Sequence, residues 1–147
     1  MNIFEVKTEK KRCLPLLLLG DEQEDMIDRY LDRGTMYALD EGGVKAVCVV
    51  TDEGGGALEL KNLAVSPECQ RRGYGRRLVR FLEETYRGRY ARLLVGTGDS
   101  PLTLPFYEAC GFVRSHVVPN FFTDHYDHPI WEGGHQLVDM IYLTKAL

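Results

Sequence analysis

The sequence lacks the features that mark several large classes of protein. Its four cysteines stand apart, with no C-x-x-C pair and no zinc-site spacing, at Cys13, Cys48, Cys69 and Cys110. We expect reduced thiols, none of them a nucleophile. No apolar run is long enough to cross a membrane, and the run 14–19 contains Pro15 and leads into acidic residues, unlike a secretory signal. These absences predict a cytoplasmic protein with no membrane partner.

The sequence also lacks an excess of positive charge. Its 147 residues include 18 lysines and arginines against 22 aspartates and glutamates, a net charge of −4. A general nucleic-acid-binding protein needs a basic surface, so we expect no nucleic-acid partner. The positive charge that is present is concentrated between Arg71 and Arg92, which indicates a small anionic ligand. The length suits one domain spanning residues 1–147.

One stretch, from Leu58 to Phe81, combines an apolar strand, a basic turn and a helix. The apolar run that ends at Val65 is typical of a buried strand, and Pro67 follows it because proline supplies no sheet donor. The turn from Gln70 to Gly75 reads QRRGYG. After it, apolar residues recur three and four positions apart, as expected of a helix packed on a core.

This turn has the properties of an anion site. The first N–H groups of a helix lack partners and carry the positive end of the helix dipole. Gly73 and Gly75 leave room for a ligand to reach the backbone, and the neighbouring arginines add positive charge. A diphosphate fits such a turn, although two glycines can also serve only to make the turn tight. The spacing is neither a dinucleotide fingerprint nor a Walker loop.

The turn resembles the Q/R-x-x-G-x-G/A acyl-CoA signature of the GNAT superfamily of N-acyltransferases. A second segment, from Phe106 to Phe112, resembles the L/F-Y-x-x-x-G-F segment of the same family. The elements we expect follow the family order. Strands are expected at 3–7, 35–39, 44–51 and 58–65. Residues 14–33 are expected to be helical, either as one helix or as a short helix at the leucines followed by a second at 22–32. A helix after 75, a strand at 91–95, a loop at 96–101, a short helix at 104–110, and strands from 112 and at 137–144 complete the order. We therefore predict an α/β GNAT fold, with a mixed, mostly antiparallel sheet and flanking helices.

The resemblance implies acetyl-CoA as the acyl donor and suggests where it binds. In the family, the pantetheine arm lies along the main chain of the central strand and the diphosphate lies on the turn. The coenzyme-binding residues predicted in this way are Leu63, Ala64, Val65, Gln70, Arg71, Arg72, Gly73, Tyr74, Gly75, Arg76, Ser100 and Phe106. Ser100 departs from the family pattern, because many relatives carry an asparagine there.

Two side chains are the catalytic residues that the resemblance implies. Tyr107 matches a tyrosine that relatives place near the coenzyme sulfur, where it hydrogen-bonds to the departing thiolate; the alternative is a packed aromatic. Glu59 matches a water-mediated base of several relatives; the alternative is a solvated or salt-bridged glutamate. An amine of pKa about 10.4 costs roughly 4.6 kcal/mol to deprotonate at pH 7, which a base could help to supply. A weakly basic arylamine needs no base.

The acceptor is expected to be a primary amine of a small molecule that attacks the thioester directly. The alternatives are an amine of a protein or peptide, and a non-catalytic module that senses acyl-CoA. In the family, the loop corresponding to residues 120–134 often borders the acceptor pocket, and here it is rich in aromatic residues and histidines. Asp124, His125, His128 and His135 lack a metal-ligand spacing, so no metal is expected. Because family dimers are common, a homodimer is also considered.

Overall fold

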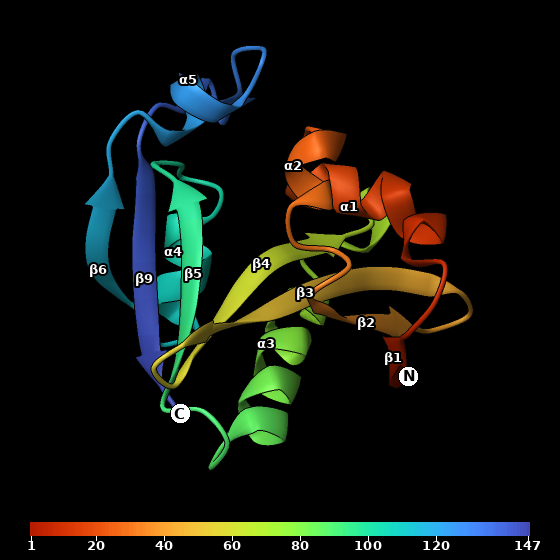
Figure 1. The fold of residues 1–147 in the computed structure, drawn as a ribbon. Helices are drawn as coiled ribbons and strands as arrows, with labels where there is room; N and C mark the ends of the chain where they lie inside the picture. The colour runs from red at the N-terminus through yellow and green to blue at the C-terminus, as the bar shows by residue number, and fades with distance from the viewer.

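A seven-stranded sheet runs through the structure, a computed structural model that describes residues 1–147 (Figure 1). The strand order is β1-β2-β3-β4-β5-β9-β6, and every neighbouring pair is antiparallel except β4 and β5. The strands are β1 (Asn2–Val6), β2 (Thr35–Asp40), β3 (Val44–Gly54), β4 (Ala57–Val65), β5 (Arg92–Gly98), β6 (Val113–Val118) and β9 (Met140–Ala146). The predicted mixed, mostly antiparallel sheet is confirmed.

Helices cover both faces of this sheet. They are α1 (Leu14–Gly20), α2 (Glu24–Asp28), α3 (Tyr74–Tyr86), α4 (Leu104–Ala109) and α5 (Phe121–His125), with 3₁₀ turns η1 (Lys10–Cys13) and η2 (Pro67–Cys69). In Figure 1, α1 and α2 lie on one side of β3 and β4, and α3 lies on the other. None of these helices combines the length and the apolar character needed to span a bilayer.

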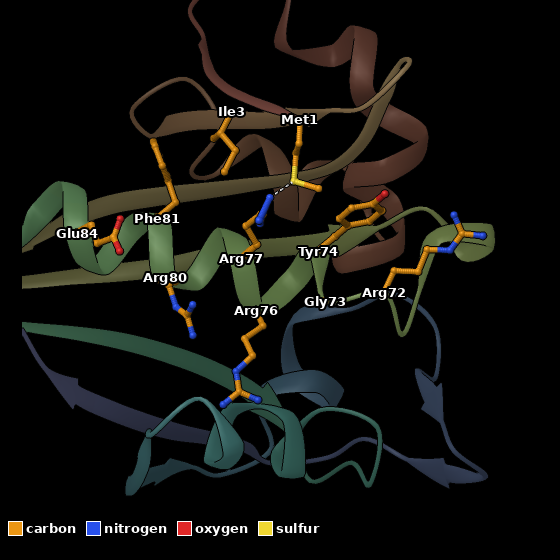
Figure 2. A pocket seen from close by; sticks show the side chains of 10 residues that line it. All are labelled: Met1, Ile3, Arg72, Gly73, Tyr74, Arg76, Arg77, Arg80, Phe81 and Glu84. Atoms are coloured by element: carbon orange, nitrogen blue, oxygen red, sulfur yellow. Dashed lines mark hydrogen bonds between the residues drawn. The ribbon is translucent and has the colours of Figure 1, made fainter.

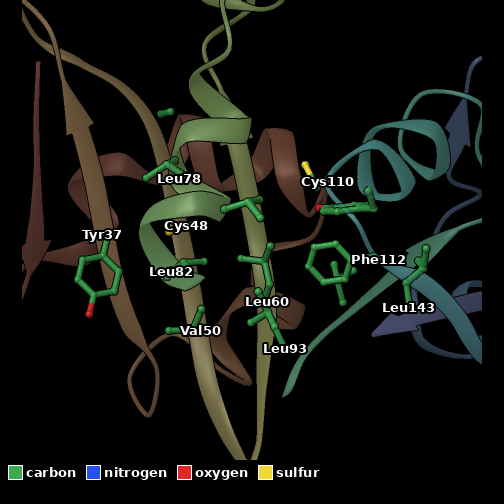
Figure 3. Close-up of a cluster of buried hydrophobic side chains, with 14 of the residues drawn as sticks. Tyr37, Cys48, Val50, Leu60, Leu78, Leu82, Leu93, Cys110, Phe112 and Leu143 are labelled. Atoms are coloured by element: carbon green, nitrogen blue, oxygen red, sulfur yellow. The ribbon is translucent and has the colours of Figure 1, made fainter. Parts of the chain in front are cut away.

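The middle of strand β3, residues 46–50, is wholly apolar because both of its faces are covered there. Side chains alternate between faces along a strand. Cys48 and Val50 therefore belong to the core beneath α3 and α4, whereas Val47 and Val49 belong to the core beneath α1 and α2. Figure 3 shows the first core, with the α3 leucines packed over the sheet and Phe112 beside them.

Helix α3 is amphipathic, as its sequence predicts. Leu78, Val79 and Leu82 are fully buried at three- and four-residue spacings, while the arginines between them stay exposed. The helix begins after Gly73, which has a left-handed backbone conformation, and ends at Tyr86.

The sheet divides between β4 and β5. Their parallel pairing covers only four residue pairs, from Ala57 with Arg92 to Leu60 with Val95. Lys61 is the extra residue of a bulge in β4, since Val49 pairs with Asn62 and Val50 pairs with Leu60. Beyond the bulge the two strands diverge, which Figure 1 shows as a V between β4 and β5. The divergence leaves this side of β4 without a strand neighbour.

Several expected boundaries are corrected by the structure. The helical region expected at 14–33 is in two pieces, α1 and α2, as one of the two alternatives predicts, because the backbone is extended at Asp21. Gly96, Thr97 and Gly98 were expected in a loop, yet they continue β5 because they pair with Tyr142, Ile141 and Met140 of β9. The last strand begins at Met140 instead of residue 137.

The segment 120–134, expected as a loop, contains regular structure. Helix α5 opens it, and a small hairpin of β7 (Trp131–Glu132) and β8 (His135–Gln136) follows. Phe122, Ile130 and Leu137 are buried together in a core of their own, which holds the segment in place. It lies above the ends of β5, β6 and β9 (Figure 1).

Candidate active site

The turn before α3 presents a continuous row of free main-chain donors. None of the six N–H groups from Arg71 to Arg76 makes a hydrogen bond within the protein, and the next N–H, that of Arg77, bonds to the Gly73 carbonyl. Arg71 has φ 65° and Gly73 has φ 82°. The left-handed conformation is unfavourable for arginine, so the surrounding structure must hold Arg71 in a backbone conformation that it does not favour by itself. Such a row of donors at a helix N-terminus suits an anion.

Neighbouring contacts fix this turn to the rest of the site. The Gln70 side chain donates from Nε2 to the Val65 carbonyl at 3.3 Å, which ties the turn to the end of β4. Gly75 lies against Phe106 of α4: a methyl group on Gly75 would stand 3.2 Å from Phe106 Cζ and 3.7 Å from Val65 Cγ2. A side chain at position 75 would therefore require the Phe106 ring to shift by a few tenths of an ångström.

The arginines around the turn point in different directions. A groove of about 580 Å³ runs along α3. Figure 2 shows the residues that line it: Met1, Ile3, Arg72, Gly73, Tyr74, Arg76, Arg77, Arg80, Phe81 and Glu84. Arg76 reaches toward α4 and donates from Nη2 to the Ala109 carbonyl at 3.1 Å. Arg77 points to Met1 on the other side of the helix. Arg72 and Arg76 thus lie near the free N–H groups, while Arg77 lies away from them.

A cleft of about 210 Å³ occupies the divergence between β4 and β5. Its walls include Leu60 to Leu63 of β4, Val95 to Gly98 of β5, and Tyr107 of α4. Its far end is formed by the α1–α2 connection and by the segment 120–138. Of the three predicted strand contacts, Leu63 lines the cleft directly, whereas Ala64 and Val65 continue β4 toward the turn.

Tyr107 lies in the wall of this cleft. Its ring is buried and makes edge contacts with Phe106 and Phe112. Burial raises the pKa of the Tyr107 hydroxyl, which therefore stays protonated at neutral pH. No other residue of the protein is hydrogen-bonded to this hydroxyl, so its proton is free to be donated into the cleft.

Glu59 is held in a polar contact at the edge of the cleft. It is only 7 % exposed, forms an ion pair with Lys61 at 3.0 Å, and accepts a hydrogen bond from the Tyr142 hydroxyl at 3.1 Å. Burial and the Glu59 carboxylate together raise the pKa of Tyr142. Lys61 lines the cleft and Glu59 does not, so the predicted role of Glu59 as a base stays a prediction.

Ser100 is buried at the loop between β5 and α4. Its hydroxyl accepts the Leu102 N–H at 3.1 Å, and its carbonyl accepts the N–H groups of Thr103 and Leu104. These bonds set the start of α4, which carries Phe106 and Tyr107. Ser100 itself is not part of the cleft wall, so its predicted contact with the coenzyme stays a prediction.

Sequence reasoning missed a polar network at the far end of the cleft. Asn62 donates from Nδ2 to the Leu17 carbonyl at 2.9 Å and to the Tyr30 hydroxyl at 3.1 Å. Tyr30 in turn donates to Asp21 at 3.0 Å, and Tyr126 donates to the other oxygen of Asp21 at 2.6 Å. The one available signal was Asn62, an asparagine within a strand that its leucines mark as buried.

This network joins the segment 120–138 to the α1–α2 connection. Besides the Tyr126 bond, the Asp127 N–H donates to Gln23 at 2.9 Å. His128 lies beside Asp127 and Glu22, and these carboxylates raise its pKa. The segment 120–138 therefore covers the far end of the cleft and is held there by these hydrogen bonds.

The four residues considered as metal ligands do not come together. No group of three or more His, Cys, Asp or Glu side chains in residues 1–147 is placed to hold a metal ion. His128 is occupied by its two carboxylate neighbours, and His125 packs against Phe121.

Comparisons with known proteins match both the fold and the turn. A family model described as "Acetyltransferase (GNAT) domain" matches residues 32–114. The uncharacterized N-acetyltransferase YvbK of Bacillus subtilis (strain 168) is 36 % identical over 135 residues, which are 90 % of this chain and 87 % of that protein.

Solved structures of similar sequence share the whole architecture. A GNAT family acetyltransferase from Elizabethkingia anophelis with acetyl-CoA bound has a TM-score of 0.93 at 32 % identity, covering 99 % of this chain and 97 % of its own. The IAA acetyltransferase from Bacillus cereus ATCC 14579 has a TM-score of 0.93 at 35 % identity, covering 99 % of both chains. A Bacillus subtilis acetyltransferase in complex with CoA has a TM-score of 0.89 at 32 % identity, covering 99 % and 98 %.

Proposed function

Since this chain belongs to the GNAT family of N-acetyltransferases, whose acyl donor is acetyl-CoA, we propose that it acetylates a primary amine of a small molecule by direct attack on the thioester. The observation that carries the proposal is the joining of two features: the row of free N–H groups from Arg71 to Arg76 and the cleft between β4 and β5. The first suits a diphosphate, and the second suits the arm that extends from it.

The residues at the turn fit acetyl-CoA as donor. Six free N–H groups with Arg72 and Arg76 nearby supply donors and positive charge for the diphosphate. Gly75 and Gly73 place no side chain over the backbone. The open side of β4 from Leu63 to Val65 supplies main-chain groups for an extended arm, as the family resemblance implies. Acetyl-CoA supplies the activated acyl group.

The cleft holds groups suited to both halves of the transfer. The amine nitrogen forms a bond to the thioester carbon while the carbon–sulfur bond breaks. Tyr107, protonated and free of internal partners, donates a hydrogen bond to the departing thiolate. The proton that leaves the amine passes to water or, through water, to Glu59, whose ion-pair partner Lys61 lines the cleft. A main-chain N–H of β4 donates a hydrogen bond to the thioester oxygen, where negative charge develops during the attack.

The dimensions of the cleft favour a small acceptor. A volume of about 210 Å³, roofed by Phe122, Tyr126 and Ile130, suits a compact amine better than an extended peptide. Because the roof is tethered to Asp21 and Gln23, a peptide would have to displace it.

The test is release of free thiol from acetyl-CoA in the presence of a panel of small amines and of short peptides with free N-termini. We expect turnover with at least one class of small amine and little with the peptides. Turnover confined to peptides, or none with any amine, would overturn the proposal.

A further inference from the structure

Two buried side-chain atoms in this protein have no hydrogen-bond partner, and both belong to residues that line the cleft. They are Asn62 Oδ1 and Glu132 Oε2. Buried polar atoms without partners are rare in folded proteins because each one costs free energy. Because both atoms belong to residues of one cleft, we expect a ligand in the cleft to supply the hydrogen-bond donors that they lack.

The Asn62 side chain is fixed, and its oxygen lies against Gly20, which lines the cleft as well. Asn62 is 3 % exposed, and its Nδ2 already donates to the Leu17 carbonyl and the Tyr30 hydroxyl. A carbonyl accepts only, so the amide cannot be turned to put Oδ1 there. The Tyr30 proton is directed to Asp21, which keeps its oxygen available to Asn62. Asn62 Oδ1 therefore needs a donor.

Glu132 approaches the cleft from β7, on a separate part of the chain. The hairpin that carries it packs on the loop before α4, where a methyl group on Gly133 would stand 3.0 Å from Pro101 Cγ. Burial and the neighbouring Glu22 raise the pKa of Glu132, and the nearby Ser100 hydroxyl opposes part of this rise. An ionised carboxylate accepts hydrogen bonds only, so Oε2 also calls for a donor.

The charges around the cleft point to a cationic donor. Its wall contains three carboxylates, Asp21, Glu22 and Glu132, and one cation, Lys61. Lys61 is already paired with Glu59. Asp21 is served by the hydroxyls of Tyr30 and Tyr126. Glu22 lies 3.5 Å from His128 Nε2. Glu132 is therefore the wall carboxylate left for a ligand cation.

We propose that the acceptor carries a second, permanently protonated nitrogen in addition to the amine that reacts, and that this second cation binds Glu132 Oε2 while Asn62 Oδ1 accepts a further N–H of the same molecule. The inference rests on the proposed function and names its substrate class: small diamines. The reacting nitrogen must be neutral when it attacks, and a carboxylate beside it would favour the unreactive ammonium form. The second nitrogen has no such requirement.

The first experiment compares three acceptors of the same chain length: an unbranched alkyl diamine, the corresponding alkyl monoamine, and the corresponding ω-amino acid. We expect kcat/KM for the diamine to exceed that for the monoamine by about tenfold or more. The amino acid should be the poorest substrate, because its carboxylate would lie beside the Glu132 carboxylate and be repelled by it. Equal kcat/KM values for the diamine and the monoamine would overturn the inference while leaving the proposed function intact.

The second experiment repeats the comparison with Glu132→Gln, and uses Glu5→Gln, an exposed glutamate on β1, as the matched control. We expect the diamine-to-monoamine ratio of kcat/KM to collapse in Glu132→Gln, mainly through KM, and to be retained in the control. If Glu132 only supports the fold, or takes the proton from the reacting amine, both acceptors lose activity alike and the ratio survives.

A binding measurement separates the inference from turnover. Calorimetric titration of the diamine into protein saturated with CoA reports acceptor binding without chemistry. We expect saturable binding that Glu132→Gln weakens about tenfold or more. No binding by the wild-type protein, or equal binding by Glu132→Gln, would overturn the inference whatever the thiol-release assay gives.

Discussion

The ring of Phe106 lies so close to Gly75 that a methyl group at position 75 would stand 3.2 Å from its Cζ atom. This contact joins the first turn of α3, which carries free N–H groups, to the helix that carries Tyr107. The spacing between the donor turn and the cleft therefore depends on a glycine.

Replacing Gly75 with alanine should weaken acetyl-CoA binding about tenfold or more. The added methyl group pushes α3 away from α4, and overpacking of this kind typically costs about 1–3 kcal/mol. Calorimetric titration with acetyl-CoA measures the change. A Gly75→Ala protein that binds with wild-type affinity would mean that this contact does not set the site.

Gly73 offers a test of backbone conformation alone. It has φ 82° with open space around it, and Gly88 shares both properties at the end of α3, away from the turn. Alanine in a left-handed conformation costs roughly 1–2 kcal/mol at either position. We expect Gly73→Ala and Gly88→Ala to lower thermal stability similarly, and only Gly73→Ala to weaken acetyl-CoA binding. Equal affinities in the two variants would contradict the assignment of the turn.

Tyr107→Phe should lower kcat about a hundredfold while changing the acetyl-CoA dissociation constant little. The ring and its contacts remain, but the hydrogen bond to the departing thiolate is lost, and general acid catalysis contributes about 10²–10⁴-fold. Tyr90→Phe, whose hydroxyl bonds only to Asp52 elsewhere on the surface, is the matched control. An unchanged kcat in Tyr107→Phe would assign the tyrosine to packing alone.

Glu59→Gln distinguishes acceptors by their basicity. An alkylamine must lose a proton before it attacks, whereas an arylamine is already neutral at pH 7. We expect kcat/KM for alkylamines to fall about tenfold or more, with arylamines nearly unaffected. Steady-state assays with one acceptor of each kind measure this. A similar loss for both kinds would show that Glu59 acts by holding Lys61 and Tyr142 in place.

Acceptor binding should depend on pH through Glu132. Because burial and Glu22 raise its pKa, Glu132 takes up a proton at a higher pH than an ordinary glutamate does. The protonated group is neutral and no longer attracts a cation. We therefore expect affinity for the diamine to fall as the pH is lowered through this raised pKa, with Asp21, whose pKa burial also raises, contributing in the same direction.

The measurement is a calorimetric series for the diamine at decreasing pH, in wild type and in Glu132→Gln. The variant should lose most of the pH dependence along with the affinity. A pH dependence identical in both proteins would assign it to Asp21 or to another group.

The strand, turn and helix proposed to hold the donor were predictable from sequence because their signals are local. A buried strand, a proline that ends it, and two glycines before a helix occupy a single stretch, and each residue type has a direct backbone consequence. The extent of β5 was not predictable in this way. Gly96 and Gly98 favour a loop by composition, and only pairing with β9 makes them part of a strand.

The acceptor side could not be derived because it has no local pattern. Asp21, Asn62 and Glu132 come from three distant parts of the chain, and their relation arises only when the segment 120–138 folds over the cleft. The aromatic residues of that segment suggested a pocket wall. Their packing into a separate core, which positions Glu132, depends on Leu137 and Ile130 meeting Phe122.

The parallel pairing between β4 and β5 is short, so the sheet consists of two halves that are joined over a narrow contact. Strands β1 to β4 form one half and β5, β9 and β6 form the other, and only four residue pairs connect them. Leu60 and Leu93, which are packed in the core of Figure 3, lie at this contact. We expect a change of side-chain volume at Leu60 or Leu93 to alter the angle between the two halves, and so to shift the affinities for donor and acceptor together.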